Sequence, residues 1–183
     1  MKRMYFAGIA MLVAATSVFA QTPAGNFDAA LAAAPRQMRD GAMVIKWKAD
    51  GTYETLRPGT NRLVCYDQSA EAAEQPFSSQ CTSVGNLDRV KQNKIYEAKE
   101  PDNAKRNALL AELEKSGERV KPEFGSVFYT FSGKDQATAR LHVTIAVPGA
   151  TTASLGLPDN NKMGGAWIMG AGTTGAHIMT PGS

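Results

Sequence analysis

The sequence predicts an α+β fold in which an antiparallel sheet carries a helical insertion packed on one face. In the first and last thirds of the 183-residue chain, apolar and polar residues alternate, as they do in strands with one buried face. Between residues 86 and 119 the chain is rich in Lys, Glu, Ala and Leu and poor in β-branched residues, which favours helix. Because short turns join the predicted strands, we expect an N-terminal meander and C-terminal hairpins.

One helix and three strands are predicted in the N-terminal third, from helix-capping residues, turn residues and the alternation of apolar and polar residues. Asn26 or Asp28 can begin an Ala-rich helix that ends before Pro35. Three strands should follow, separated by an Asp-Gly turn and a Pro-Gly-Thr-Asn turn. They are expected over residues 43–48, 52–57 and 62–66.

The middle third predicts two helices, since Pro101 breaks the helical pattern and Asp102 can cap a second helix that stops at Gly117. Its charges are mixed in sign, as on a solvated helix face, and we assign them no binding role. The last third returns to strands. These are expected over residues 124–131, 140–147, 166–169 and 176–179.

The first 20 residues have the three parts of a secretory signal peptide. Lys2 and Arg3 precede an apolar run, and Val18-Phe19-Ala20 provides the small residues of a cleavage site. A transmembrane anchor is less favoured, because the run is shorter than the roughly 20 residues that cross a bilayer. We therefore expect residues 1–20 to be removed, residues 21–183 to form one domain without a membrane span, and the product to be exported to the periplasm or the medium.

The charge balance disfavours binding to nucleic acid. The chain has 20 basic and 17 acidic residues and a pI near 8.9. Two of the basic residues lie in the predicted signal, which leaves 18 basic and 17 acidic residues in the exported part. Contacts to phosphates need a concentrated positive face, so we expect no nucleic-acid partner, and the sequence identifies no other.

The two cysteines, Cys65 and Cys81, predict a disulfide. Both lie in the exported part, and an even count in an oxidising compartment favours pairing. A metal site is disfavoured because no histidine is near them in the sequence, and a catalytic thiol would need a base. The bridge would close a largely polar loop over residues 67–80.

The segment from Gly170 to Gly175 matches the glycine pattern of dinucleotide-binding proteins. That chemistry also needs a helix after the glycines and an acidic residue about 20 positions further on. Only eight residues follow Gly175, and none of them is acidic. We therefore predict a turn between two strands, and we expect neither a cofactor nor a metal site.

The candidate functional surface is the end of the sheet that carries the two histidines. His142 lies on the polar face of its predicted strand beside Arg140. His177 and Met179 point the same way from a later strand, because side chains two residues apart share a face. The residues expected to bind are Arg140, His142, Trp167, Met169, His177 and Met179.

Three functions fit these residues. The first is a non-catalytic binding or interaction protein, because the chain lacks the G-x-S-x-G, S-x-x-K and H-E-x-x-H signatures. The second is a hydrolase with His142 or His177 as general base. The third is a copper-binding protein, since the His177-x-Met179 pair resembles that of periplasmic copper chaperones and thioether and imidazole suit copper.

Two patches also resemble a group of uncharacterised secreted bacterial proteins. The first is the C-terminal segment with Gly164–Met169, Gly172-Thr173 and Ala176–Pro181. The second is the Gly59-Thr60-Asn61 turn followed by Cys65. The chain departs from the group after Gly172-Thr173, where Thr174 stands in place of an aromatic residue. The resemblance implies no particular activity.

Overall fold

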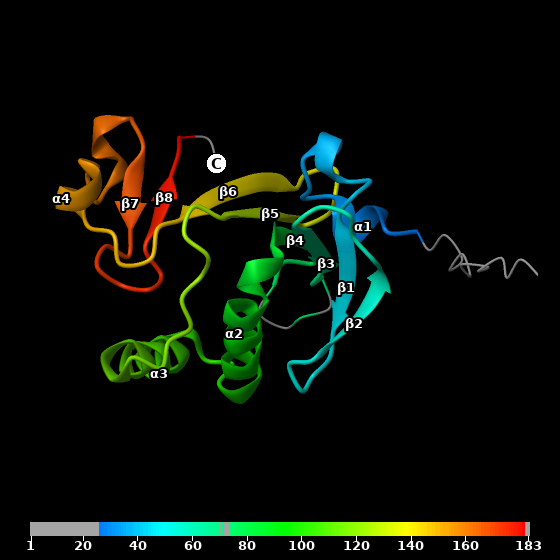
Figure 1. Cartoon of the computed structure of the whole chain (residues 1–183), viewed down its shortest axis with the longest axis horizontal. Helices are drawn as coiled ribbons and strands as arrows, with labels where there is room; N and C mark the ends of the chain where they lie inside the picture. The colour runs from blue at the N-terminus through cyan, green and yellow to red at the C-terminus, as the bar shows by residue number, and fades with distance from the viewer. Residues whose placement is uncertain (1–25, 70, 72–73, 182–183) are drawn as a thin grey trace, which may run out of the picture.

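A computed structural model describes residues 26–69, 71 and 74–181 (Figure 1). The predicted signal peptide, residues 1–20, lies outside the described residues. The helices are α1 (Asp28–Leu31), α2 (Leu87–Lys99), α3 (Asn103–Ser116) and α4 (Thr152–Leu155), with short 3-10 helices at Arg36–Met38, Val84–Asn86 and Asn161–Met163. The strands are β1 (Met43–Trp47), β2 (Tyr53–Arg57), β3 (Leu63–Asp67), β4 (Phe77–Ser83), β5 (Val127–Gly133), β6 (Arg140–Ala146), β7 (Trp167–Met169) and β8 (His177–Met179).

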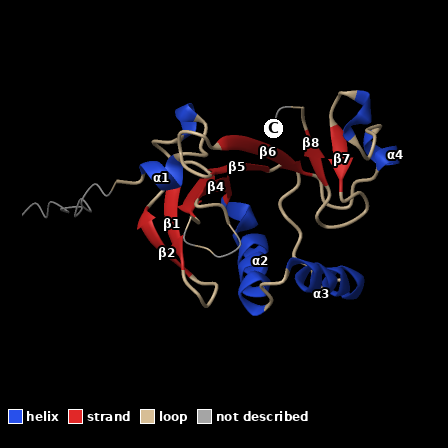
Figure 2. Cartoon of the chain, turned by 180° about the vertical axis from the view of Figure 1, so that it is seen from behind, coloured by secondary structure: helices blue, strands red, loops and turns tan. Residues whose placement is uncertain are grey.

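The described strands form an eight-stranded sheet in the order β2-β1-β3-β4-β5-β6-β8-β7. Apart from β1 and β3, all neighbouring strands are antiparallel. The two long strands β5 and β6 connect the N-terminal half of the sheet to β8 and β7 (Figure 2). The α+β class and the helical insertion are therefore confirmed.

The expected N-terminal meander is wrong in one respect, because β3 runs parallel to β1 on the side opposite β2. The turn after β2 crosses the start of β1. There the backbone N–H groups of Thr60 and Asn61 both donate to the Gly41 carbonyl, at 2.8 and 3.0 Å. The crossing is close enough that a Cβ on Gly59 would lie 2.6 Å from the Met43 nitrogen. Glycine at this position thus allows the parallel arrangement.

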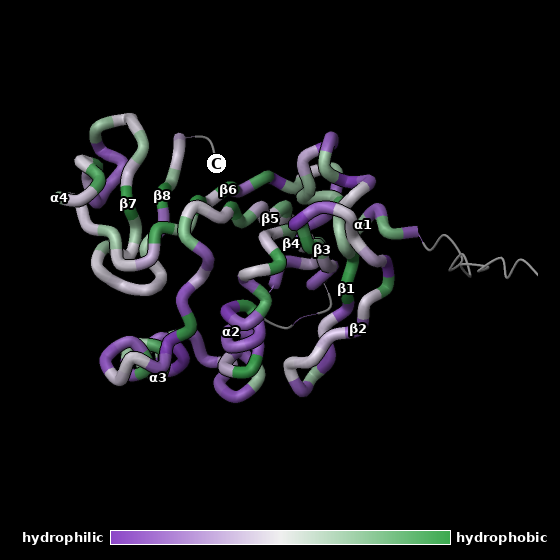
Figure 3. The backbone as a smooth tube through the Cα atoms, in the orientation of Figure 1, coloured by the Kyte–Doolittle hydropathy of each residue, from purple (hydrophilic) through white to green (hydrophobic). Residues whose placement is uncertain are grey.

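Strand β1 is buried on both faces rather than on one. Val44 packs with residues of α1, β3 and β4, whereas Ile45 packs on the other face with Val90 of α2 and Tyr66. Both side chains are almost fully buried. The alternation in the sequence predicted burial of the Ile45 face only. Val44, on the opposite face, is buried by residues from distant parts of the chain, which the local pattern cannot show. Figure 3 shows hydrophobic residues along β1 and more hydrophilic residues along α2 and α3.

Strand β4 lies where the sequence predicted the end of a polar loop. Ser78, Ser79 and Thr82 are buried, which is possible because their hydroxyls form hydrogen bonds. Ser79 Oγ donates to the Ala30 carbonyl at 2.9 Å, and Thr82 Oγ1 donates to the Val127 carbonyl at 3.0 Å. Strand β4 also places Cys81 directly opposite Cys65 of β3, and the two form the predicted disulfide.

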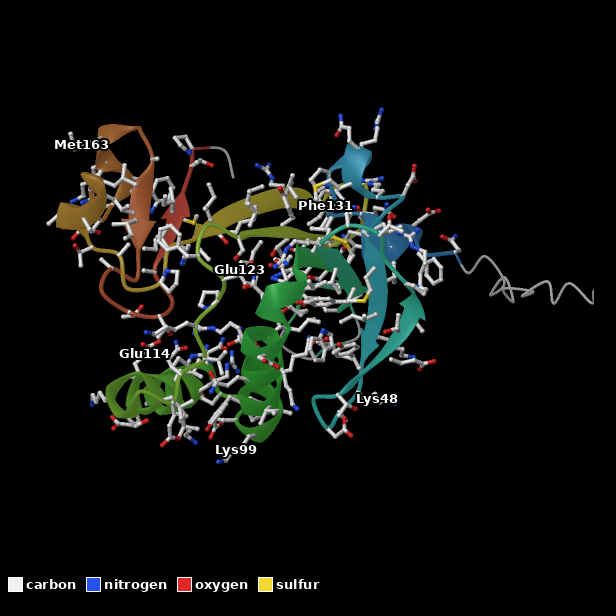
Figure 4. All side chains as sticks on the ribbon, in the orientation of Figure 1. Lys48, Lys99, Glu114, Glu123, Phe131 and Met163 are labelled. Carbon is white, nitrogen blue, oxygen red and sulfur yellow. A yellow bond between two sulfur atoms is a disulfide. The ribbon has the colours of Figure 1, made fainter. Side chains whose placement is uncertain are left out.

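The predicted limits of the helical insertion are confirmed. The Asp102 carboxylate accepts from the Lys105 N–H at 2.9 Å, and Gly117 ends α3 with a positive φ of 79°. Helix α2 packs on the sheet, but α3 has no buried residue. Instead, Glu114 of α3 accepts hydrogen bonds from the backbone N–H and the hydroxyl of Thr174. In Figure 4, Glu114 lies on the side of α3 that faces the C-terminal strands.

The glycine-rich segment from Gly170 to Gly175 is the turn between β7 and β8, as predicted. Arg89 of α2 reaches the same turn and donates to Thr174 Oγ1 at 2.8 Å. The segment therefore docks the helical insertion against the C-terminal strands. Among the described residues, no helix is long and apolar enough to cross a membrane.

Candidate functional site

The register of the sheet places the six predicted residues on one face. In an antiparallel ladder, directly opposed residues point to the same side, and so do residues two apart on one strand. Trp167 opposes Met179, and Met169 opposes His177. Met179 in turn opposes Thr144 of β6, which is two residues from His142. Helix α2 covers the same face at the other end of the sheet. Thr144 opposes Phe128 of β5, and Phe128 packs against the buried cluster that contains Val90 of α2.

Four of the six residues form a compact group on β7 and β8, which we call the Met-His cluster: Trp167, Met169, His177 and Met179. Opposed side chains in such a ladder have Cβ atoms about 4.5–5.5 Å apart, so their functional groups can converge. Met179 is 7% exposed, His177 is half-buried, and Met169 is 45% exposed. The cluster therefore reaches from the interior to solvent.

The imidazole of His177 is oriented by the backbone. Its Nδ1 lies 2.8 Å from the carbonyl oxygen of Gly175. Because a carbonyl oxygen only accepts, Nδ1 carries the proton in this contact. A neutral ring in this orientation presents Nε2 with a free lone pair, which is the form that acts as a ligand or a base.

Arg140 and His142 lie apart from the Met-His cluster. Ala146 opposes His177 and is four residues from His142 along β6, which corresponds to about 13 Å along the strand. His142 instead continues a polar row across the sheet. In that row Tyr66 donates to Gln80, and Gln80 donates to Thr130, which opposes His142. The two histidines therefore do not form one site.

A hydrolase would need a histidine within hydrogen-bond reach of a hydroxyl or a carboxylate. In the part of the chain that the structure describes, neither His142 nor His177 makes a hydrogen bond to a Ser, Asp or Glu side chain. Nor do the described residues contain a group of three or more His, Cys, Asp or Glu that could hold a metal ion. The geometry thus offers no support for the hydrolase interpretation.

A pocket of about 300 Å³ lies between the end of β1 and helix α2. No pattern in the sequence by itself predicted this pocket. Its walls combine an indole, short apolar groups and four charged side chains. The residues that line it are Trp47, Lys48, Ala49, Glu71, Lys94, Glu97, Ala98 and Pro101. Lys48 is labelled in Figure 4 near the turn that joins β1 and β2.

The ammonium group of Lys94 already occupies an aromatic and acidic corner of this pocket. Lys94 Nζ lies 2.5 and 2.6 Å from the two carboxylate oxygens of Glu71. It also lies 5.7 Å from the ring centroid of Trp47 and 5.2 Å from that of Tyr66. The two rings meet edge to face, with centroids 5.9 Å apart. Only 11% of the Lys94 side chain is exposed, so these contacts replace its hydration.

Glu97 adds a second carboxylate to the pocket, so the lining carries two glutamates and two lysines. Burial raises the pKa of the Glu97 carboxyl, with further increases from Glu71 and Glu74, and Lys94 offsets this only in part. Burial likewise raises the pKa of the Tyr66 hydroxyl, again with a contribution from the neighbouring glutamates. Within the described residues, Glu97 makes no ion pair. The pocket therefore holds a half-buried carboxylate whose ionised form would be stabilised by an added positive charge.

One local signal pointed to this pocket. Glu97 and Ala98 follow Lys94 by three and four residues, so both lie on the same side of α2 as Lys94. We interpreted the charges on this helix as solvated because the sequence does not show that Trp47 and Glu71 face them. Those contacts come from distant parts of the chain and exist only in the folded sheet.

Comparison of the chain with protein-family models, curated proteins and solved structures finds no match.

Proposed function

We propose that this protein is an exported, non-catalytic binding protein whose pocket beside α2 takes a small organic cation with an apolar body. The observation that carries the proposal is the position of Lys94. An alkylammonium group lies there against two aromatic rings and a carboxylate, which is the chemistry that recognises amines and quaternary ammonium ions.

A ligand would occupy the remaining space and meet Glu97. The half-buried carboxylate has no partner of its own among the described residues, so a cation near it gains a charge-assisted contact. The apolar part of the ligand would pack on Trp47, Ala98 and Pro101. A volume of about 300 Å³ is at the lower end of the range for small-molecule sites, which suits a compact amine.

Export is supported by two features. The segment 1–20 has the pattern of a signal peptide. The Cys65–Cys81 disulfide is of the kind that persists in oxidising compartments. We assign the protein to the periplasm or the medium on this basis.

The proposal is tested by titration with two cations, butylammonium and choline, and with 3,3-dimethylbutan-1-ol, the neutral analogue of choline. Binding is followed by calorimetry and by the emission of Trp47 in a Trp167→Phe background, where it is the single tryptophan, since the chain has two. We expect the cations to bind and the alcohol to bind at least about tenfold more weakly, because a contact to a charged group contributes about 1.5–3 kcal/mol. Cation affinity should fall as the pH falls through the raised pKa of Glu97, because protonation removes the negative charge.

Glu97→Gln should reduce the affinity for both cations about tenfold and leave the alcohol unchanged. The matched control is Glu118→Gln, which removes the same charge from an exposed position. Equal binding of alcohol and cations, an unaltered affinity in Glu97→Gln, or no binding of either cation would each overturn the proposal.

A further inference from the structure

We infer that Met169, His177 and Met179 form a binding site for a soft monovalent metal ion, Cu(I). This site does not depend on the proposed function of the pocket, because it lies at the opposite end of the sheet on β7 and β8. The sequence indicated only the pair His177 and Met179. The structure adds Met169 as a third ligand and Gly175 as the group that orients the histidine.

The three ligand side chains project from one face of a two-stranded ladder. Met169 and His177 are directly opposed, so their Cβ atoms are about 4.5–5.5 Å apart. Met179 follows His177 by two residues and lies on the same face, about 7 Å further along the strand. Methionine side chains are long and unbranched, so both thioethers can reach toward the imidazole between them.

The imidazole is prepared for coordination. The hydrogen bond from Nδ1 to the Gly175 carbonyl fixes the ring and leaves Nε2 as the nitrogen available to a metal ion. Metal-binding histidines characteristically make such a second contact, which sets the tautomer and the orientation of the ring. An ordinary core histidine can make the same hydrogen bond without binding a metal, so the bond by itself does not indicate a site. Here the histidine side chain lies on the face from which the Met169 and Met179 side chains also project.

The ligand set selects for a soft ion. Thioether sulfur and imidazole nitrogen suit Cu(I), whereas magnesium, calcium and manganese prefer carboxylate and carbonyl oxygens. The exposure of the ligands also suits uptake, because Met169 is 45% exposed and Met179 is 7% exposed. An ion can therefore meet the outer thioether first and be held by the inner one. This proposal departs from the expectation from sequence that the chain has no metal site.

The experiment is a competition titration of the full chain with Cu(I) against bicinchoninate, under anaerobic conditions. A parallel titration uses Ag(I), which is also a soft d¹⁰ ion and needs no reductant, so the disulfide stays intact. The emission of Trp167, which opposes Met179, is recorded in a Trp47→Phe background. We expect one ion per chain, with quenching of Trp167.

Met169→Leu, Met179→Leu and His177→Asn should each weaken binding at least about tenfold, the size of effect that even supporting residues have at metal sites. Leucine conserves the volume of methionine, and asparagine keeps a side-chain donor for the Gly175 carbonyl, so the fold should persist. Circular dichroism checks this for each variant. The matched controls are Met163→Leu, an 81% exposed methionine of the same C-terminal unit (Figure 4), and His142→Asn.

X-ray absorption of the Cu(I) complex should show both sulfur and nitrogen ligands. The inference is overturned by a complex that bicinchoninate fully strips. Binding that survives Met169→Leu and His177→Asn would equally overturn it, as would binding that the control variants weaken to the same degree.

Discussion

Removal of the Cys65–Cys81 cross-link should lower the thermal stability of this protein by a predictable amount. The two cysteines are 16 residues apart in sequence, and in the chain-entropy model a loop of about 15 residues corresponds to about 3 kcal/mol. In a chain of this size each kcal/mol changes Tm by about 2–4 °C, so we expect a decrease of about 6–12 °C.

The packing around the bridge determines how this measurement should be made. Both cysteines are fully buried in the cluster that joins α1 to β1, β3 and β4. A reductant should therefore act only on unfolded chains, and the native protein should show no reactive thiol after incubation with it. Protein that is unfolded in reductant and then refolded keeps both sulfur atoms in the core, so it isolates the effect of the cross-link.

The assay is thermal unfolding followed by circular dichroism for the oxidised protein, the refolded reduced protein and the Cys65→Ala/Cys81→Ala variant. The variant should be no more stable than the reduced protein, because it also loses buried atoms. A reduced protein that melts within about 2 °C of the oxidised one, well inside the interval expected from the entropy model, would refute the reasoning.

Two further predictions concern the helical insertion and the N-terminus. Burial acts to raise the pKa of the Glu114 carboxyl, but the hydrogen bonds from Thr174 and the charges of Arg89 and Arg119 outweigh it and leave this pKa below its ordinary value of 4.5. Stability from a lowered pKa is present above the ordinary pKa and is lost as the pH falls through the folded one. Glu114→Gln should therefore be less stable to urea than the wild type at pH 7, and the gap should narrow as the pH falls below 4.5. A gap that stays equally large as the pH falls would contradict this, and Glu112→Gln is the control. Mass spectrometry of the protein recovered from the periplasm or medium of a bacterial host should show a chain that starts at Gln21, and one that retains Met1 would disprove the predicted cleavage.

Much of the fold could be predicted because its signals are local. The cap at Asp102, the end of α3 at Gly117 and the turn at residues 170–175 depend on residues next to them in the chain. The disulfide could be predicted from the cysteine count and the signal peptide together. Strand β4 could not be predicted, because Ser79 and Thr82 are polar residues that are usually exposed. They are buried here only because distant carbonyl groups accept hydrogen bonds from their hydroxyls.

The candidate sites, too, could be predicted only where their signals are local in the sequence. Alternation along β8 predicted that His177 and Met179 share a face, and no more than the strand period was needed. That Met169 opposes His177 depends on the register of β7 against β8, which a glycine-rich turn does not fix on its own. The separation of His142 from His177 likewise follows from the register of β6 against β8, because Ala146 and not His142 opposes His177.

The sequence by itself determined the α+β class, the limits of the helical insertion, the disulfide and the expectation of export. Each depends on a short segment or a composition, so the physical cause lies within a few residues. The tertiary structure decided the parallel position of β3 beside β1 and the pocket where Trp47, Glu71 and Lys94 meet. These contacts join residues more than 20 positions apart, and only burial of the sheet under α2 brings them together.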